Sequence, residues 1–362
     1  MKSDKRIIIG LLMCAAFSFL YAGEKDERLR LIHADQLKQE TIGQQTYQKL
    51  QGQVEFQQGS TVIKCDAATQ AIDRDPVALI GHVHICNESR TLRADTVYFY
   101  QNEKKQIASG RVLSITESDT TTADRLVYYE GENKLVSEGN VRIANPKERT
   151  VLTGGYAEYF RSQKFGKVVL QPVLIKLDSL GIETMRIFGD TMEVFEGGER
   201  TVAEGAVRIV QPRTEATCQR AEYFKKEEKT VLTGSPKVLQ SNHEISGDTL
   251  WLYLEDAQLA RAQVKGNGLV TADADTLNKG RWVNKLTGQA MEFYFQDKKL
   301  AKVVVFNQAT SLYHVIEKNE YKGLNEVTGD KIEVFLENGE AQRVRVTSDP
   351  ELSMGKYSPP KI

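Results

Sequence analysis

The chain has 362 residues, of which 27% are charged and 40% are apolar, and its formal net charge is −1. These values fit a folded protein with a sizeable core and exclude bulk disorder. They also argue against nucleic-acid binding, since that function needs a strongly basic domain or stripe.

The first element along the chain is an N-terminal apolar segment. Lys2, Lys5 and Arg6 precede the run "IIIGLLMCAAFSFLYA", which ends at Ala22 and is followed by the polar stretch "GEKDERLR". A basic start, an apolar centre and a small residue at the end are typical of a signal peptide. The run is also short for the ~20 residues of a membrane-spanning helix. We therefore predict a signal peptide over residues 1–22 and an exported protein, the alternative being a retained N-terminal anchor.

Three cysteines follow that segment, namely Cys65, Cys86 and Cys218. An odd number of widely spaced cysteines does not form a disulfide framework, even in an oxidising compartment. We therefore expect packing and backbone pairing to hold the fold, with Cys65 and Cys218 as small apolar fillers.

An internal repeat begins near residue 50 and is the strongest signal in the sequence. Four glycines, each 29 residues after the preceding one, open segments of the form G-x-V: Gly52, Gly81, Gly110 and Gly139. An aspartate follows each of the first three glycines by 14 residues: Asp66, Asp95 and Asp124. The pattern resumes at Gly205, so a longer connection is expected between residues 160 and 190. Beyond Asp248 the markers widen to steps of 41 residues, which predicts longer loops there.

The segments that follow the markers alternate between apolar and polar side chains. After positions 95, 124, 155, 190, 219, 248, 289 and 330, the residues two and four places later are all apolar or aromatic. The residue between them is glutamate in five of the eight copies. This alternation is typical of strands with one buried face, and the polar connections suit hairpin turns. The sequence therefore predicts an all-β fold of stacked antiparallel strands.

The stretch "GHVHIC" contains a candidate metal site. His82, His84 and Cys86 alternate along one strand, and imidazole and thiolate are competent ligands for a transition metal. However, these residues lie between Val83 and Ile85, which should face inward, and the other repeats do not carry them. We predict that the three side chains face solvent and that the protein holds no metal or cofactor.

The recurring aspartates have two interpretations. Stacked carboxylates can bind calcium or act as an acid and base pair. Alternatively, each aspartate at the start of a strand can accept hydrogen bonds from the local backbone. The second, structural interpretation is favoured because the same column also contains Gly155, Gln219 and Gln289.

The repeats carry a family resemblance. Their pattern is G-x-V-x-[IVF], about ten residues, then [AG]-D-x-[LVIM]-x-[YFVL], as in "GHVHICNESRTLRADTVYFY", "GRVLSITESDTTTADRLVYY" and "GSPKVLQSNHEISGDTLWLY". This pattern resembles the OstA/LptA family of lipopolysaccharide-transport proteins over residues 31–335. The resemblance implies a solenoid-like open β-jelly-roll in the periplasm, with an apolar trough for the acyl chains of lipid A. It also implies partners of related fold in the inner-membrane export complex and the outer-membrane translocon.

The resemblance gives the inward columns a role in lipid binding. The candidate lining residues are Val97, Phe99, Leu126, Tyr128, Tyr159, Met192, Val194, Tyr223, Leu250, Leu252, Met291 and Phe293. We predict a first segment of this kind over residues 23–160, a second over 161–348 that continues it, and an irregular tail over 349–362. Free strands at the two ends, near "LRLIHADQL" and "NEVTGDKIEVFLE", are expected to join head to tail with other copies or partners.

Three alternatives remain open from the sequence. A structural β-solenoid scaffold needs the same alternation but fills its interior with its own side chains. A chain related to the N-terminal domain of the translocon, without its barrel, carries the same repeats. A carbohydrate-active solenoid enzyme needs a pair of acidic residues on one outer face. The outward glutamates are too evenly spread to identify such a pair. The sequence therefore favours a non-enzymatic lipid carrier.

Overall fold

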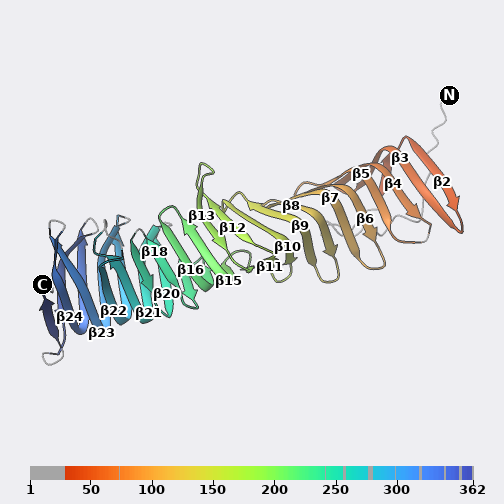
Figure 1. The fold of residues 1–362 in the computed structure, drawn as a ribbon. Helices are drawn as coiled ribbons and strands as arrows, with labels where there is room; N and C mark the ends of the chain where they lie inside the picture. The colour runs from red at the N-terminus through yellow and green to blue at the C-terminus, as the bar shows by residue number, and fades with distance from the viewer. Residues whose placement is uncertain are drawn as a thin grey trace. The chain divides into compact units, whose positions relative to one another are not determined.

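The computed structural model describes residues 29–360, apart from residues 73, 241, 256–257, 276–279, 298, 318–319, 338–339 and 350–352. All regular elements among these residues are β-strands, as the alternation predicts (Figure 1). The predicted signal peptide, residues 1–22, lies outside the described residues. Nowhere in the described part of the chain is there a helix long and apolar enough to cross a membrane.

The chain divides into two compact units, the first ending at Gly181 and the second beginning at Ile182. The division proposed from the sequence falls between residues 160 and 161, in the turn before β11. Unit 1 contains β1 (Arg30–His33), β2 (Gln36–Ile42), β3 (Gln45–Gln58), β4 (Thr61–Ala71), β5 (Val77–Cys86), β6 (Thr91–Tyr100), β7 (Lys105–Ile115), β8 (Thr120–Tyr129), β9 (Lys134–Asn145), β10 (Thr150–Phe160), β11 (Phe165–Val169) and β12 (Val173–Leu177).

Unit 2 contains β13 (Glu183–Phe188), β14 (Thr191–Phe195), β15 (Arg200–Gln211), β16 (Thr214–Phe224), β17 (Lys229–Thr233), β18 (Lys237–Gln240), β19 (His243–Ser246), β20 (Thr249–Glu255), β21 (Gln258–Asp273), β22 (Val283–Gln296), β23 (Lys299–Glu317), β24 (Glu320–Glu337), β25 (Glu340–Thr347) and β26 (Met354–Ser358).

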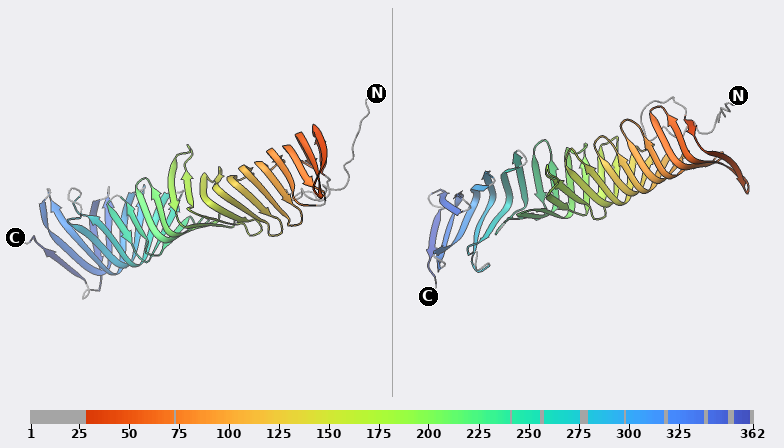
Figure 2. Two further views of the ribbon diagram at one scale, coloured as in Figure 1. Left: turned by 45° about the vertical axis from the view of Figure 1, so that its right-hand side comes forward. Right: turned by 90° about the horizontal axis from the view of Figure 1, so that it is seen from above.

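Each unit is a meander in which strands pair antiparallel with their neighbours in sequence. From β3 to β10 every strand pairs with the next one along its length. In other rungs the strand is split in two, as where β17 and β18 both pair with β16. The strands of each unit therefore stack like rungs, which Figure 2 shows from two further directions.

Every full-length rung bends at a corner near its middle, and the corner explains the repeated glycine and aspartate. In β7 the corner is Gly110 and Arg111, with φ angles of +77° and +47°, and the pairing with β6 slips there. The facing corner residue on β6 is Asp95, whose carboxylate lies against Gly110 and accepts a hydrogen bond from Arg111 at 2.5 Å. Asp66 and Asp124 likewise lie against Gly81 and Gly139 of the following repeats, so the role of these aspartates is structural.

The corner divides each strand between two sheet layers, which we call arm 1 and arm 2. In β6, arm 2 is Thr91–Ala94 and arm 1 is Thr96–Tyr100. Residues from both arms share one buried cluster in unit 1, including Phe56 and Ile85 from arm 2 and Leu79 from arm 1. The two arms therefore face each other, and the core lies between them.

Three expectations about irregular segments need correction. The widened spacing beyond Asp248 comes only partly from a longer connection, between the end of β21 at Asp273 and the start of β22 at Val283. It also comes from longer strands, since β23 has 19 residues and β24 has 18 and the added residues continue to pair. Within the tail expected to be irregular, Met354–Ser358 forms β26, which pairs with the free edge of β24. The stretch "NEVTGDKIEVFLE", expected at the terminal edge, lies in β24, which pairs with β23 on one side and with β25 and β26 on the other.

The corner glycine gives a stability prediction. Replacing Gly110 with alanine should destabilise the surrounding strands by about 3 kcal/mol, because a side chain is strained at positive φ and must also displace Asp95. The added Cβ would lie 2.4 Å from the Asp95 carboxylate oxygen Oδ2. Gly43 is the control, since its φ is +63° but nothing lies within 4 Å of an added Cβ. Gly43→Ala should cost only about 1–2 kcal/mol in urea unfolding, and equal losses would contradict the role of Asp95.

Candidate functional site

The candidate site is the inner surface between the two arms. We call the inward positions beside the corner the first tier and the next inward positions the second tier. In β6 the first tier is Ala94 and Val97, and the second tier is Leu92 and Phe99. All four side chains are buried, so the predicted inward parity is correct in this strand.

The first tier closes the bottom of the trough in both units. In unit 2 its arm 1 members are all buried: Met192, Ala203, Ala221, Leu232, Leu250, Val264, Met291 and Val305. On arm 2 the first-tier positions hold small residues. A Cβ added to Gly247 would lie only 2.3 Å from Val264. Small inward residues such as Ala94 and Ala221 are buried there and let the two arms meet closely beside the corner.

The second tier is mostly filled in the first rungs of unit 1. Between β3 and β7 its apolar members are buried on both arms, as is Gln106: Phe56, Ile63, Val77, Ile85, Leu92 and Phe99. The polar members Gln48, Gln70 and Ser114 are half-buried. Among the predicted lining residues, Val97 and Phe99 in β6 and Leu126 and Tyr128 in β8 are buried. This stretch of the trough is packed largely by its own side chains.

The second tier is open in unit 2 between β13 and β20. On arm 1 the residues Val194, Tyr223 and Leu252 are half-buried. On arm 2 the facing residues are also half-buried: Ile187, Ile209, Val238 and Ile245. Farther along, Val270, Leu286 and Val327 continue this row on arm 2, whereas Phe293 on arm 1 is buried.

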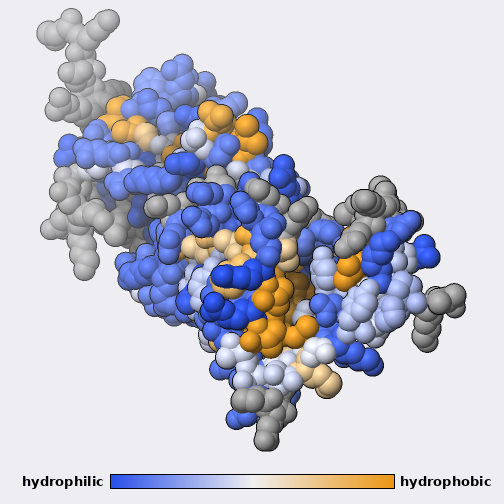
Figure 3. Space-filling view, turned by 90° about the vertical axis from the view of Figure 1, so that its left-hand side faces the viewer, coloured by the Kyte–Doolittle hydropathy of each residue, from blue (hydrophilic) through white to orange (hydrophobic). Residues whose placement is uncertain are grey.

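Figure 3 looks onto the C-terminal end of unit 2 and shows hydrophobic side chains gathered in a hollow between hydrophilic walls. The last strands of this unit also carry exposed apolar side chains: Tyr313, Val344, Met354 and Tyr357. The interior of unit 2 therefore presents an apolar surface that solvent reaches from the mouth of the trough.

On the outer face of arm 1 the outward glutamates form ion pairs with a neighbouring row of cationic and aromatic residues. Cross-strand neighbours alternate there between aromatic and cationic residues: Phe195, Arg200, Phe224, Lys229, Tyr253, Arg261, Tyr294, Lys302, Phe335 and Arg343. The cations also pair with the glutamates of the adjacent row, as Arg200 does with Glu222 at 2.7 Å. Lys302 similarly approaches Glu333, which is only 6% exposed, to 2.7 Å. Sequence parity located the outward face correctly but could not reveal this cross-strand network, because it depends on register.

Of the three candidate metal residues only His82 is exposed, and its Nδ1 lies 2.8 Å from the Asp66 carboxylate at the corner. His84 and Cys86 are half-buried, whereas Val83 and Ile85 between them are buried. Within the described residues, no group of three His, Cys, Asp or Glu side chains is arranged to hold a metal ion. Cys65 and Cys218 are buried free thiols, and burial raises their pKa to about 11.

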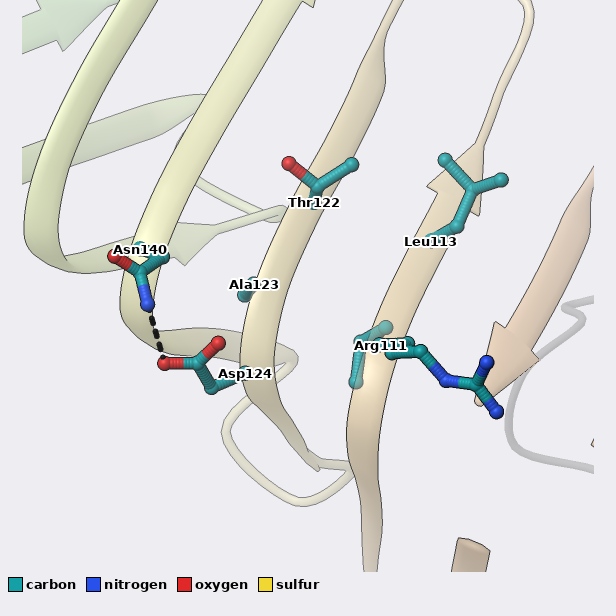
Figure 4. A pocket seen from close by; sticks show the side chains of 7 residues that line it. Arg111, Leu113, Thr122, Ala123, Asp124 and Asn140 are labelled. Atoms are coloured by element: carbon teal, nitrogen blue, oxygen red, sulfur yellow. Dashed lines mark hydrogen bonds between the residues drawn. The ribbon is translucent and has the colours of Figure 1, made fainter. Parts of the chain in front are cut away.

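A shallow hollow of about 350 Å³ lies outside the trough, on the outer side of the corner between β7 and β9. Its lining includes Leu113, Thr122, Asp124 and Asn140, and Asn140 Nδ2 donates to Asp124 Oδ2 at 2.8 Å (Figure 4). Arg111 is turned away toward Asp95, which accepts its hydrogen bonds and whose pKa is thereby lowered. The polar groups of this hollow are therefore engaged in corner contacts.

Comparisons with known proteins agree with the repeat pattern. Residues 120–258, less than half of the chain, match the family model described as LptA/(LptD N-terminal domain) LPS transport protein. A solved structure that is similar is LptH, described as the LptA homologous periplasmic component of the conserved lipopolysaccharide transport device from Pseudomonas aeruginosa. It is 18% identical, the alignment covers 40% of this chain and 95% of that chain, and the TM-score is 0.31. No curated protein matches the sequence.

Proposed function

We propose that this OstA/LptA-like chain is a periplasmic, non-enzymatic carrier that holds lipopolysaccharide by its acyl chains and passes it from the inner to the outer membrane. The family match over residues 120–258 supports a role related to lipopolysaccharide transport. The observation that carries the proposal is the open second tier of unit 2, where Tyr223 and Leu252 on one arm and Ile209 and Ile245 on the other are half-buried.

This surface suits a ligand that is retained but able to slide. Each methylene buried against the lining contributes roughly 0.8 kcal/mol, and an acyl chain offers many of them. The contacts are non-directional, so successive rungs offer similar environments rather than one fixed pocket. The half-buried ring of Tyr223 adds a large apolar contact area to this lining.

A scaffold is the second candidate, and the filled rungs of unit 1 favour it locally. From β3 to β7 the apolar side chains of the second tier are buried, including Phe56 and Phe99. A chain that only supports other proteins needs no open lining. Relationship to the N-terminal domain of an outer-membrane translocon is a further possibility within the carrier class, because the family description covers that domain as well.

Crosslinking tests the carrier proposal directly. A photo-crosslinking residue at Tyr223 or Leu252 should capture lipopolysaccharide in cells, because these side chains line the open trough. The adjacent outward residues Glu222 and Trp251 are matched controls on the same strands and should capture little, because neighbouring strand residues point to opposite faces. Phe99, which is 2% exposed, should also capture little. Equal labelling at all five positions would indicate nonspecific association and would sink the proposal.

We also propose that the chain joins head to tail through its free edges. At one end, the seven residues of β2 are all exposed, and β2 pairs with β3. At the other end, β25 and β26 both pair with β24. Free strand edges can pair with strands of another chain.

Proline substitutions that block one edge at a time test this assembly. Two adjacent prolines at Gln39 and Glu40, or at Val344 and Arg345, remove at least one backbone donor that faces outward. Each variant alone should remain monomeric in sedimentation analysis, because a head-to-tail contact needs one free edge of each kind. A mixture of the two should still form heterodimers through the unblocked ends. Long oligomers of either single variant would place the interface elsewhere.

A further inference from the structure

The second tier of unit 1 contains two stretches that differ in packing. The filled stretch lies in β5 and β6, where the second-tier side chains are buried on both arms: Val77, Ile85, Leu92 and Phe99. The accessible stretch lies in β9 and β10, where solvent reaches the second-tier side chains on both arms: Leu135, Ile143, Leu152 and Tyr159. An acyl chain therefore finds an apolar surface that it can cover in the accessible stretch but not in the filled one.

The buried core of unit 1 divides at the same place. One cluster of buried side chains extends from β3 to β8 and includes Phe99 and Leu126. Ile143 and Leu152 pack against a second cluster, which spans β8 to β11: Ala123, Val141, Ala157 and Val168. This packing places Ile143 and Leu152 on the inner surface of the trough, where their remaining area can meet a ligand.

Polar residues separate the two stretches. On arm 2, the half-buried Ser114 and Thr121 are cross-strand neighbours that lie between Leu92 and Ile143. On arm 1, Gln106 is 5% exposed, and neither its Nε2 nor its Oε1 has a hydrogen-bond partner among the described residues. Covering the two hydroxyl groups with methylene groups would remove water from them without replacing its hydrogen bonds. An acyl chain therefore gains little by extending from β9 toward the N-terminus.

Tyr128 closes arm 1 at this boundary. Its ring is 7% exposed, and its register partners are Gln106 in β7 and Leu135 in β9. The Tyr128 hydroxyl donates a hydrogen bond to Asn133 Oδ1 at 3.1 Å, and the Arg161 guanidinium carbon lies 4.8 Å from the ring centre. These two contacts hold the ring in place. On arm 1 it is the first buried second-tier side chain that a chain lying on Leu135 would meet.

The similarity to lipopolysaccharide-transport proteins begins at the same boundary. The family model matches residues 120–258, and Thr120 is the first residue of β8. The filled stretch lies before the matched residues, whereas the accessible stretch lies within them. The part of unit 1 that is similar to the family is therefore the part whose trough can take an acyl chain.

We propose that a set of second-tier residues forms an end wall, which stops the acyl chains of the lipid at β8: Val77, Ile85, Leu92, Phe99, Gln106 and Tyr128. The proposal rests on the carrier function above and adds where the lipid path ends within unit 1. Apolar contacts are non-directional, so a trough that is open along its whole length would let a chain slide either way. The end wall limits sliding in one direction. Lipid therefore occupies unit 1 only between β8 and β12, and it enters or leaves sideways through the gap between the two arms.

Photolabelling of the unmodified full chain tests where the lipid path ends. The probe is lipid A with a photoreactive diazirine at the tip of one acyl chain, and mass spectrometry identifies the labelled residues. Label should be found on the accessible stretch and should stay at background on the filled stretch. Equal labelling of both stretches would overturn the end wall, although the carrier function would stand.

Tyr128→Ala tests the face of the end wall. Without the ring, the acyl tip should move toward the N-terminus by one rung, about 4.8 Å, so that label appears on Gln106. Tyr129→Ala is the matched control, because Tyr129 is the next residue of β8 and has the opposite parity. It should keep the labelling pattern of the unmodified chain. A Tyr128→Ala variant that is folded by circular dichroism but has an unchanged pattern would contradict the stop at Tyr128.

The remaining outcomes separate the end wall from the carrier function. If the probe labels the open trough of unit 2 but not the accessible stretch, unit 1 holds no lipid and the proposal fails while the carrier function stands. If the probe labels neither unit, the carrier function fails and the end wall fails with it. A Tyr128→Ala variant that does not fold removes only the second test, because the map of the unmodified chain still decides where the path ends.

Discussion

Replacing Leu252 with aspartate should weaken binding of lipopolysaccharide to the purified chain by at least about tenfold. Leu252 lies in the second tier of unit 2 and is half-buried. An acyl chain that reaches this position would lose apolar contact and would also remove water from the new carboxylate. Desolvating an ionised group without a partner is costly, so the bound state should suffer much more than the empty one.

The control for this substitution lies three residues earlier. Thr249→Asp introduces the same charge in β20 at the opposite parity, beside the corner residue Asp248. Binding should remain within about twofold of the unmodified chain. Leu252 is reached by solvent in the empty trough, so circular dichroism should show both variants folded. A folded Leu252→Asp variant with unchanged affinity would exclude the unit 2 trough as the lipid site.

Replacing Phe99 with alanine should destabilise the first rungs of unit 1 by about 3–5 kcal/mol. The ring is 2% exposed and packs in the filled cluster between the two arms, so its removal leaves a cavity. Because each rung of a repeat protein contacts mainly its neighbours, the loss should be local. Amide hydrogen exchange in β5, β6 and β7 should therefore accelerate by roughly a hundredfold or more, at 1.4 kcal/mol per tenfold.

The same truncation in the open trough is the matched comparison. Tyr223 occupies the corresponding second-tier position in β16 but is only half-buried. Tyr223→Ala should cost about 1–2 kcal/mol, because the side chain already meets solvent and loses fewer contacts. Equal costs at Phe99 and Tyr223 would contradict the distinction between closed and open rungs.

The sequence alone indicated which side chains of a strand share a face, because side chains alternate between the two faces along every strand. It placed Val97 and Phe99 inward and His82 outward, and the structure agrees at each of these residues. The 29-residue repeat likewise predicted the stacked rungs. The sequence also showed that the aspartate recurs at a fixed distance after the glycine, but it did not show which residue the aspartate contacts. Asp95 meets Gly110 of the following repeat, a contact that only strand pairing creates.

The sequence alone therefore determined the all-β class, the repeat and the inward parity of strands such as β6, since these follow from the period and the side-chain chemistry of each strand. Tertiary structure decided where the trough is open. Phe99 and Tyr223 occupy equivalent positions in the repeat, yet one is buried and the other half-buried. Their difference depends on the separation of the two arms and on the side chains that face them from other strands.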